Sequence, residues 1–274
     1  MEPIKSIFKA PYNFFLKKNE FPRFIPESGG VGKKYSKFQC RLYQIKGMFI
    51  KHNQKRHYDS LAVQPDYSVP YIYLALHSEA KRTTNPAGGY FADQKLILEM
   101  LLSLMPEDWF IYIKEHPVQL DVRENSQRPR INGYYDEFEV SKRVKFIRLE
   151  EIPFNLIDNA RAVTTICGNP GWEAVNRGVP ALVFGDAWYA GCEGVFRILN
   201  YEDCKRALKT IQEDYQVDVK KVKKFWFAID KCTSRGSVSI SNRKEYGIDY
   251  EENVSILADL LSKKINNDKN EGPI

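Results

Sequence analysis

The chain has 274 residues, of which 43% are hydrophobic and 13% aromatic, a composition that supports a buried core and excludes an intrinsically disordered protein. Its apolar runs are far too short to cross a bilayer, and residues 1–15 lack the apolar segment and cleavage site of a secretory signal. Five scattered cysteines form no Cys-x-x-Cys pair. This pattern disfavours a metal site or a disulfide framework and favours a reducing cytoplasm.

Positive charge is concentrated at the amino terminus. The formal net charge is +6, but residues 1–60 alone hold 13 Lys and Arg against 4 Asp and Glu, a balance of +9. Because aromatic residues accompany these cations, the segment is expected to approach an anionic membrane face, nucleic acid or a phosphorylated substrate. The alternative is a solvated, partly extended arm that packs its aromatic side chains on the main body.

Residues 1–65 are predicted to form a basic and irregular arm. Prolines recur among the basic residues, and the stretch "ESGGVGKK" at 27–34 is typical of a loop. This loop is not a phosphate-binding P-loop, because it lacks the GxxxxGK[ST] spacing and follows no apolar strand. The stretch "CRLYQIKGMFIKH" at 40–52 is expected to be a helix or a strand near the main body.

From residue 71 onward, strand patterns alternate with helix patterns. Strands are predicted over 71–76, 109–114, 143–149, 162–167 and 180–185. Helices are predicted over 93–105, 152–160, 171–178, 201–212, 218–232 and 251–265, the first with Asp93 as its N-cap. This alternation predicts an α/β fold with a Rossmann-like parallel sheet and helices on both faces, over a domain of residues 66–265. Residues 266–274 are expected to be a disordered tail.

The polar segments that follow the predicted strands are the candidate ligand site. In parallel sheets, ligands bind outside the carboxyl ends of the strands. Four such segments are rich in reactive side chains: "HSEAKRTTNPAGG", "EHP", "LEEIP" and "GNPG". We therefore expect a ligand at this edge of the sheet.

The "GNPG" segment, Gly168–Gly171, enters a short helix. Its glycines allow a sharp turn and a close approach by a ligand, while Pro170 fixes its own φ. The first N–H groups and the dipole of the helix favour an anion such as phosphate. Glu173 would then reach the hydroxyls of a ribose or sugar. In the alternative interpretation, Glu173 only stabilises its own helix start and the glycines only make a tight turn.

The "KEHP" run ends the second predicted strand. His116 is expected to donate a hydrogen bond to a phosphate, and Pro117 to stop the strand and hold the imidazole outward. Lys114 and Glu115 point to opposite faces, because side chains alternate along a strand. The alternative is a histidine that only packs in the core.

Two further loops carry candidate ligand contacts. His77 and Glu79 follow the first strand, and cations and hydroxyls for an anionic group come next, at Lys81, Arg82, Thr83 and Thr84. The alternative is that this loop is only a solvated, charged segment without a ligand. After the fifth strand, Trp188 and Tyr189 are expected to stack on a base or sugar. The alternative is that they only cap the core. The chain lacks the GxSxG, HExxH and GxGxxG motifs, which argues against a serine hydrolase, a zinc protease and a dinucleotide-binding fingerprint.

In this order, the segments "LHSEAKRTTNPAGGYFADQ", "YIKEHP" and "TTICGNPGWEAVNRGVPALVFGDAWY" resemble the bacterial capsule polysaccharide biosynthesis family, which includes the Kdo transferases of capsule assembly. The resemblance covers about residues 70–195. Members have the GT-B glycosyltransferase fold, in which two Rossmann-like domains hold a nucleotide-activated donor mostly in the carboxyl-terminal one. The region from Tyr71 onward is similar to that carboxyl-terminal half.

The resemblance implies roles for particular residues. His116 and Pro117 match a His-Pro pair that contacts the donor's phosphate or ribose, and Gly168–Gly171 match the phosphate loop. Glu173 matches an acid near the donor's ribose or sugar. The residues expected to bind the donor are therefore His77, Arg82, Lys114, Glu115, His116, Pro117, Thr165, Gly168, Asn169, Pro170, Gly171 and Glu173. Catalytic roles, with no step assigned, are implied for His116, Glu173 and Glu79.

The resemblance also implies the reaction and its partners. The chain is expected to be a metal-independent glycosyltransferase without cofactors, because GT-B enzymes commonly use helix dipoles and basic residues to stabilise the leaving phosphate. The suggested donor is CMP-Kdo, and the acceptor a glycan or glycolipid. Further expected partners are an anionic membrane surface, through residues 1–60, and other polysaccharide-assembly proteins, but not nucleic acid. The expected location is cytoplasmic, peripheral at the inner face of the plasma membrane.

One departure from the family leaves alternatives open. Residues 1–70 are too short and irregular for an acceptor domain, so residues 1–65 are either an arm or the remnant of such a domain. The chain is then a fragment or a minimal member, or another chain supplies the acceptor side. The general base therefore has no assignment. Other hypotheses are an enzyme similar to UDP-sugar epimerases or CDP-glycerol polymerases, and a non-catalytic subunit that binds a nucleotide sugar or glycan. The enzyme classes differ in the donor that they use, which is a CMP-sugar, a UDP-sugar or a CDP-polyol. A non-catalytic subunit would bind a donor without turning it over.

Overall fold

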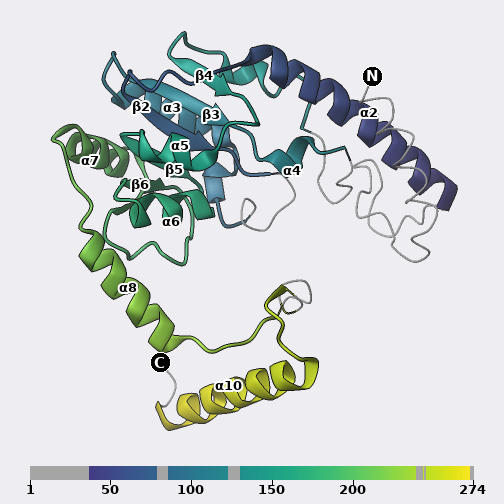
Figure 1. The fold of residues 1–274 in the computed structure, drawn as a ribbon, viewed down its shortest axis with the longest axis vertical. Helices are drawn as coiled ribbons and strands as arrows, with labels where there is room; N and C mark the ends of the chain where they lie inside the picture. The colour runs from purple at the N-terminus through teal and green to yellow at the C-terminus, as the bar shows by residue number, and fades with distance from the viewer. Residues whose placement is uncertain (1–36, 79–85, 123–129, 239–242, 244, 272–274) are drawn as a thin grey trace. The chain divides into compact units, whose positions relative to one another are not determined.

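A computed structural model describes residues 37–78, 86–122, 130–238, 243 and 245–271. Seven parallel strands form one sheet in the order β1-β4-β3-β2-β5-β6-β7 (Figure 1). Their bounds are β1 Ala62–Val63, β2 Tyr71–Ala75, β3 Phe110–Lys114, β4 Val144–Ile147, β5 Ala162–Thr165, β6 Ala181–Val183 and β7 Val195–Arg197. The sheet predicted from the alternating pattern is confirmed.

The strand order places a topological switch point at the centre of the sheet. From β2 the chain proceeds outward through β3 and β4, then returns to the other side of β2 for β5, β6 and β7. Leaving out the short edge strand β1, this is the order 3-2-1-4-5-6 of doubly wound dinucleotide-binding sheets. Loops that leave β2 and β5 in opposite directions open a crevice there, which is where such sheets bind ligands.

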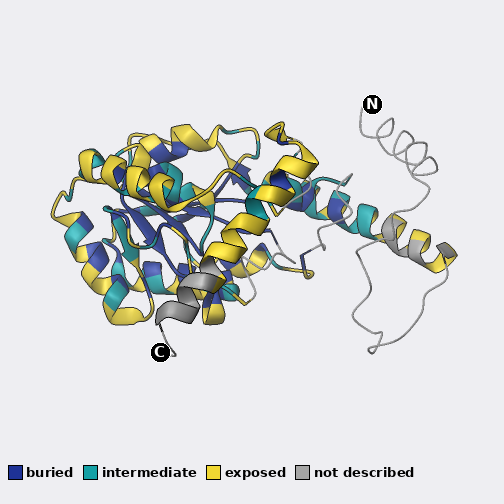
Figure 2. Ribbon diagram, turned by 90° about the horizontal axis from the view of Figure 1, so that it is seen from below, coloured by how far each residue is buried: buried dark blue, intermediate teal, exposed yellow. Residues whose placement is uncertain are grey.

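Helices cover both faces of the sheet. The domain contains α2 Lys37–Leu61, α3 Gln94–Leu104, α4 Pro117–Leu120, α5 Pro153–Asp158, α6 Asn169–Asn176 and α7 Tyr201–Gln212, with short 3-10 turns at Gly89–Ala92 and Asp136–Phe138. On one face, Ile72 and Leu74 of β2 belong to a buried core that includes residues of α3 and α7. On the other face, the Tyr71 hydroxyl donates to the Leu156 carbonyl of α5 (2.7 Å). The central strands β2, β5 and β6 are buried along their whole length between these layers (Figure 2).

Local signals in the sequence account for the helix ends that matter most for the site. The Asp93 side chain accepts a hydrogen bond from the Lys95 N–H (3.1 Å), so the predicted N-cap of α3 is confirmed. Gly178, which follows α6, has a φ of +84°, a conformation that a residue with a Cβ rarely adopts. The chain can therefore leave α6 and enter β6 within a few residues.

Two predictions about the chain's ends are wrong. Residues 37–61 are not an irregular arm but the helix α2, which confirms the helix alternative for residues 40–52, and β1 then pairs with β4 as part of the sheet. No proline falls within α2, so its backbone N–H groups are all available for helical hydrogen bonds. At the other end, α10 Tyr250–Glu271 continues into the segment expected to be a disordered tail. The predicted arm over residues 1–36 lies outside the described residues.

The chain divides into two compact units, residues 1–219 and 220–274. The first unit contains the sheet and its covering helices. The second contains most of α8 Val219–Cys232 and all of α10, and Asn253 of α10 exchanges two hydrogen bonds with the Ser237 backbone (2.8 and 3.0 Å). In the described part of the chain, no helix is long and apolar enough to cross a membrane.

The core on the α3 face is expected to dominate stability. Leu98 of α3 is fully buried, whereas its neighbour Leu96 is 40% exposed. Leu98→Ala should lower the free energy of unfolding by about 2–5 kcal/mol, because it removes buried methyl groups and leaves a cavity. Leu96→Ala, the matched control, should cost less than about 1 kcal/mol. Urea unfolding followed by circular dichroism measures both, and similar costs for the two variants would contradict the observed orientation of α3.

Candidate functional site

The loops after β2 and β5 meet at the switch point through His77 and Thr165. His77 Nε2 lies 2.7 Å from Thr165 Oγ1, and the Gly168 N–H donates to the same hydroxyl oxygen (3.2 Å). Both side chains are buried. His77, Thr165 and Gly168, all predicted to bind the donor, thus lie together at the switch point. Their binding to a donor stays a prediction.

The glycines of the "GNPG" turn make room for neighbouring protein side chains. A Cβ on Gly168 would lie 3.0 Å from the His77 ring and from Thr165 Oγ1, and a Cβ on Gly171 would lie 2.5 Å from the Tyr189 hydroxyl. Gly168 has a φ of −80°, which any residue can adopt. These glycines are thus needed for close packing. The expectation that they create room for a ligand is not what the geometry shows.

The start of α6 offers less to an anion than the sequence suggested. Pro170 has no N–H, and the Gly171 N–H donates to the Gly168 carbonyl (3.3 Å). The Trp172 N–H donates to the Tyr189 hydroxyl, which itself donates to the Gly168 carbonyl. Within the described residues, the Asn169 N–H has no hydrogen-bond partner. This N–H and the helix dipole are what α6 presents to a ligand.

A second group of polar side chains lies on the α5 and α6 face of the sheet. Tyr73 is two residues from Ala75, which pairs in register with Lys114, so Tyr73 and Lys114 point to the same face. Both are only 3% exposed. Glu173, one turn into α6, is close enough to Tyr73 for its charge to act on the Tyr73 hydroxyl. We call Tyr73, Lys114 and Glu173 the partnerless triad, because no hydrogen bond or ion pair joins their side chains to any described residue.

Burial shifts the pKa of each member of the partnerless triad toward its neutral form. Desolvation lowers the pKa of the Lys114 ammonium, partly offset by the nearby Glu150 and Glu151. Desolvation raises the pKa of Glu173 despite the opposing charge of Arg177, and it raises the pKa of Tyr73, with a further rise from the charge of Glu173. A buried amine and phenol with a half-buried carboxyl group, at the edge where such sheets bind ligands, can bind an anion and exchange protons with it.

Glu115 does not have the predicted role in ligand contact. Its carboxylate is fully buried and accepts hydrogen bonds from Arg130 Nε (3.0 Å), the Tyr135 hydroxyl (2.9 Å) and the His116 N–H (2.7 Å). Arg130 also donates to the His77 carbonyl (2.6 Å). The physical reason is that a carboxylate on the core side of the strand end needs a counter-ion, and Arg130 supplies it. Glu115 therefore holds the loops after β2 and β3 in place.

His116 caps a short helix with its ring. It precedes α4, and its Nδ1 accepts a hydrogen bond from the Val118 N–H (3.2 Å), with Pro117 at the first helical position. Because Nδ1 is the acceptor, the proton of a neutral ring is on Nε2, which is then a donor. The half-buried imidazole is thus fixed in orientation. The predicted donation of a hydrogen bond to a phosphate would use this Nε2–H, and it stays a prediction.

The other residues that were predicted to contact a ligand lie in different environments. Tyr189 is fully buried and packs under Gly171, so it caps the core and does not stack on a ligand. Trp188 is 51% exposed, and its ring centroid lies 4.9 Å from that of Trp172. The predicted contacts at Glu79, Lys81, Arg82, Thr83 and Thr84 lie outside the described residues. Among the residues that are described, no group of three or more His, Cys, Asp or Glu could hold a metal ion.

Sequence reasoning missed Tyr73 and Arg130. Tyr73 lies within a strand of alternating aromatic and aliphatic residues, so the sequence pattern predicts only a core position for it. Its register with Tyr112 on β3 puts it on the Lys114 face, and period-2 alternation in the two strands was the available signal. Arg130 lies in a polar segment between β3 and β4, and no sequence motif links it to Glu115.

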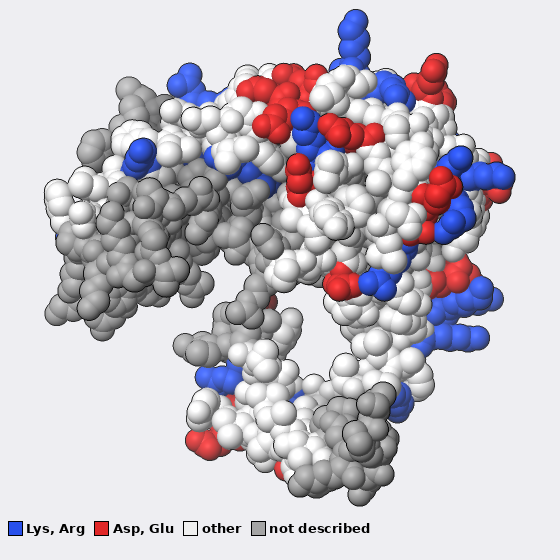
Figure 3. Space-filling model, turned by 180° about the vertical axis from the view of Figure 1, so that it is seen from behind, with Lys and Arg blue, Asp and Glu red and all other residues white. Residues whose placement is uncertain are grey.

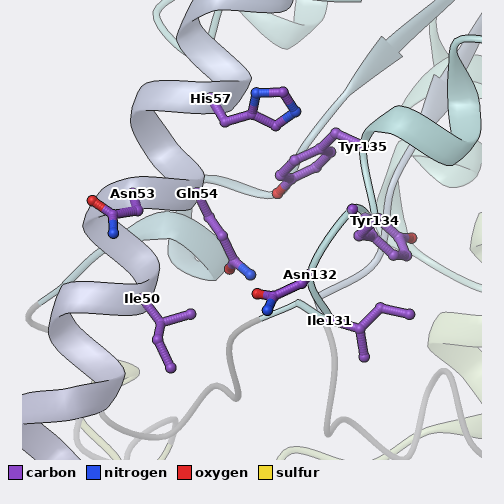
Figure 4. Close-up of a pocket in the computed structure, with 9 residues that line it drawn as sticks. Ile50, Asn53, Gln54, His57, Ile131, Asn132, Tyr134 and Tyr135 are labelled. Carbon is purple, nitrogen blue, oxygen red and sulfur yellow. The ribbon is translucent and has the colours of Figure 1, made fainter.

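A surface hollow of about 230 Å³ lies between α2 and residues 131–135 (Figure 4). Asn53, Gln54 and His57 of α2 line one side of it. Gln54 also accepts from the Arg130 N–H (3.0 Å), and His57 Nε2 lies 2.6 Å from Asp136 Oδ1. None of the residues predicted from the sequence lines this hollow, so it is distinct from the switch-point site.

The strand order and the switch-point loops define a Rossmann-like α/β protein. The chain belongs to the family described as capsule polysaccharide biosynthesis protein, because residues 32–223 match the sequence profile of that family. The family resemblance noted from the sequence motifs is thereby confirmed. No curated protein sequence matches the chain.

Solved structures give distant likenesses. The chain is similar to a UDP-GlcNAc 2-epimerase from Methanocaldococcus jannaschii, with a TM-score of 0.40, 16% identity and coverage of 71% of this chain and 52% of that one. It is also similar to the KpsC β-Kdo 2,7-transferase of Thermosulfurimonas dismutans (TM-score 0.37, 16% identity, coverage 61% and 56%). The KpsC β-Kdo 2,4-transferase of that organism gives a TM-score of 0.37 and 17% identity, with coverage of 68% of this chain and 58% of that one. The chain spans between 52% and 58% of these proteins, and likenesses this distant carry no conclusion about a ligand or a reaction.

The buried ion pair is expected to be needed for stability. Arg130→Met leaves the Glu115 carboxylate buried without its counter-ion and should cost about 3–5 kcal/mol in free energy of unfolding. Adding Glu115→Gln should recover part of that loss, because a neutral amide needs no counter-ion. Urea unfolding measures both variants. Arg197→Met, which breaks an exposed pair with Asp186 (2.5 Å), is the control and should cost less than about 1 kcal/mol.

Glu173 is expected to destabilise the fold at neutral pH. Its raised pKa means that the folded chain holds this proton more tightly than the unfolded chain, so the carboxylate is unfavourable once the pH exceeds the folded-state pKa. Glu173→Gln should therefore melt at a higher temperature than the parent at pH 8, and the difference should shrink as the pH falls toward 4.5. Glu107→Gln, at an exposed position, is the control. A gain of the same size at every pH would rule out a role for ionisation.

Proposed function

We propose that this chain is the donor-binding domain of a glycosyltransferase that uses a nucleotide-activated sugar in surface polysaccharide synthesis. The observation that carries the proposal is the partnerless triad beside the switch point. Lys114 is buried without an ion pair to any described residue, and Glu173, whose charge acts on Tyr73, has a raised pKa. Both features are unfavourable for folding, which is typical of residues retained for a ligand. Membership in the capsule family supports the same reading.

The residues suggest how a donor would be held. Lys114 would neutralise a phosphate, with a hydrogen bond from His116 Nε2–H and from the Asn169 N–H at the start of α6. These groups would stabilise the negative charge that develops on the leaving nucleotide phosphate. Glu173 would accept a hydrogen bond from a ribose or sugar hydroxyl, and Tyr73 would donate one.

The finer features of the proposal concern the substrates. The proposed donor is CMP-Kdo or a similar CMP-sugar, transferred in a GT-B type reaction to a glycan or glycolipid. The acceptor would be bound by another domain or chain, and other polysaccharide-assembly proteins are proposed partners. The proposed location is the cytoplasmic face of the plasma membrane. Transfer would need no metal, because the cations of the site would neutralise the phosphate.

The test is a thermal-shift panel of CMP, CDP, UMP, UDP, GDP and ADP without added metal. A ligand that binds only the folded state at about 100 times its dissociation constant adds about 2.7 kcal/mol of stability, so a selective rise with CMP is expected. A selective rise with UDP or CDP would replace the CMP-sugar by another donor class. Binding without transfer or hydrolysis would mark a non-catalytic subunit. No rise with any nucleotide would contradict the proposed donor site.

His116 permits a variant that separates ligand binding from stability. His116→Asn keeps a side-chain acceptor at the N-cap of α4 but removes the Nε2–H, whereas His116→Ala removes both. Both variants should lower nucleotide affinity, and only His116→Ala should also lose about 1 kcal/mol of stability. Isothermal titration and urea unfolding measure the two effects. Unchanged nucleotide affinity in His116→Asn would leave the imidazole with a capping role alone.

A further inference from the structure

An apolar stripe is exposed along the first half of α2. It consists of Phe38, Leu42, Ile45 and Phe49, with exposed fractions of 69%, 50%, 49% and 57%. The spacing of four, three and four residues places all of them on one face of the helix. Four large apolar side chains in one row are a contiguous patch, and such patches mark interaction sites.

The second half of α2 is attached to the domain. Lys51 Nζ donates to the Asp121 carbonyl (3.3 Å), Gln54 bonds to Arg130, and the buried Tyr58 hydroxyl donates to the Ile147 carbonyl (2.6 Å). The helix continues from these contacts toward its amino end, where the stripe lies and where Figure 2 shows exposed residues. The fold thus holds the stripe on a helix whose other end is anchored.

Cations accompany the stripe. Helix α2 contains six Lys and Arg and a single acidic residue, Asp59. At 100° per residue, the exposed Arg41 and Lys46 lie on opposite sides of the stripe, and Arg56 lies in line with it two turns further on. On the face drawn in Figure 3, by contrast, acidic and basic side chains lie next to one another over much of the surface. An apolar row with flanking cations is typical of helices that lie in the interface of an anionic bilayer.

We propose that the stripe on α2 docks on an anionic phospholipid surface. The apolar side chains would enter the boundary between headgroups and acyl chains, and Arg41, Lys46 and Arg56 would contact lipid phosphates. A second copy of α2 fits less well, because it would bring two strongly cationic helices together. The inference does not depend on the nucleotide site, and each can fail without the other.

The test is co-sedimentation of the full chain with vesicles of phosphatidylcholine alone and of phosphatidylcholine with phosphatidylglycerol at 3:1. We expect binding to the anionic vesicles that weakens as salt is raised. Leu42→Ser with Phe49→Ser should reduce the partition coefficient about tenfold or more, because two interfacial anchors are lost. Arg41→Gln with Lys46→Gln should reduce it about fivefold for each charge.

Matched controls separate the stripe from general stickiness. Leu199→Ser, at a position 62% exposed, and Lys205→Gln with Lys209→Gln, on the exposed side of α7, should leave vesicle binding unchanged. Circular dichroism and nucleotide binding should be unchanged in all variants. Equal vesicle binding by Leu42→Ser with Phe49→Ser, or no binding by the parent chain, would overturn the proposal. So would a lipid-free dimer, seen by sedimentation velocity, that the same variant dissociates, because a second copy would then cover the stripe.

Discussion

The buried carboxylate of Glu115 is the constraint around which the switch-point edge is organised. It is held by Arg130, by the Tyr135 hydroxyl and by the His116 N–H, and Arg130 extends the same network to the His77 carbonyl. A charge without solvent needs such partners, since losing one leaves an uncompensated ion in a low-dielectric interior. Through this one side chain, the end of β3, the end of β2 and the segment after residue 130 are fixed relative to one another.

The partnerless triad differs from this network in a way that helps to locate function. Glu115 and Arg130 satisfy each other, so their burial is explained by structure alone. Lys114, next to Glu115 in the chain, is almost as deeply buried and has no such partner among the described residues. Because side chains alternate along a strand, adjacent residues enter opposite environments. One strand end therefore supplies both a structural anchor and a buried amine that the fold alone does not explain, which is why we propose that Lys114 binds a ligand.

The sequence predicted β2 to β6 because each is part of an apolar run bounded by turn signals. It did not predict β1, which has only two residues, or β7, which is as short as β6 but is not fully buried and lies in no long apolar run. For α2 the sequence predicted only a helix or a strand over residues 40–52, because its exposed apolar stripe lies among charged residues and covers only the first half of the helix. Candidate site residues were predicted where a polar side chain directly follows a strand, as with His116. The pairing of Glu115 with Arg130 and the contact of Tyr189 with Gly171 depend on three-dimensional packing, which spacing in the sequence does not encode.

The short strands at both edges of the sheet have a consequence for self-association. An edge strand presents unpaired backbone groups, and a long flat edge is a template for a strand from another chain. Here β1 pairs through two residues and β7 through three, so either border offers few groups to an incoming strand. Contacts between this domain and other macromolecules are therefore expected to involve side chains, and growth of the sheet into ordered aggregates is disfavoured at its margins.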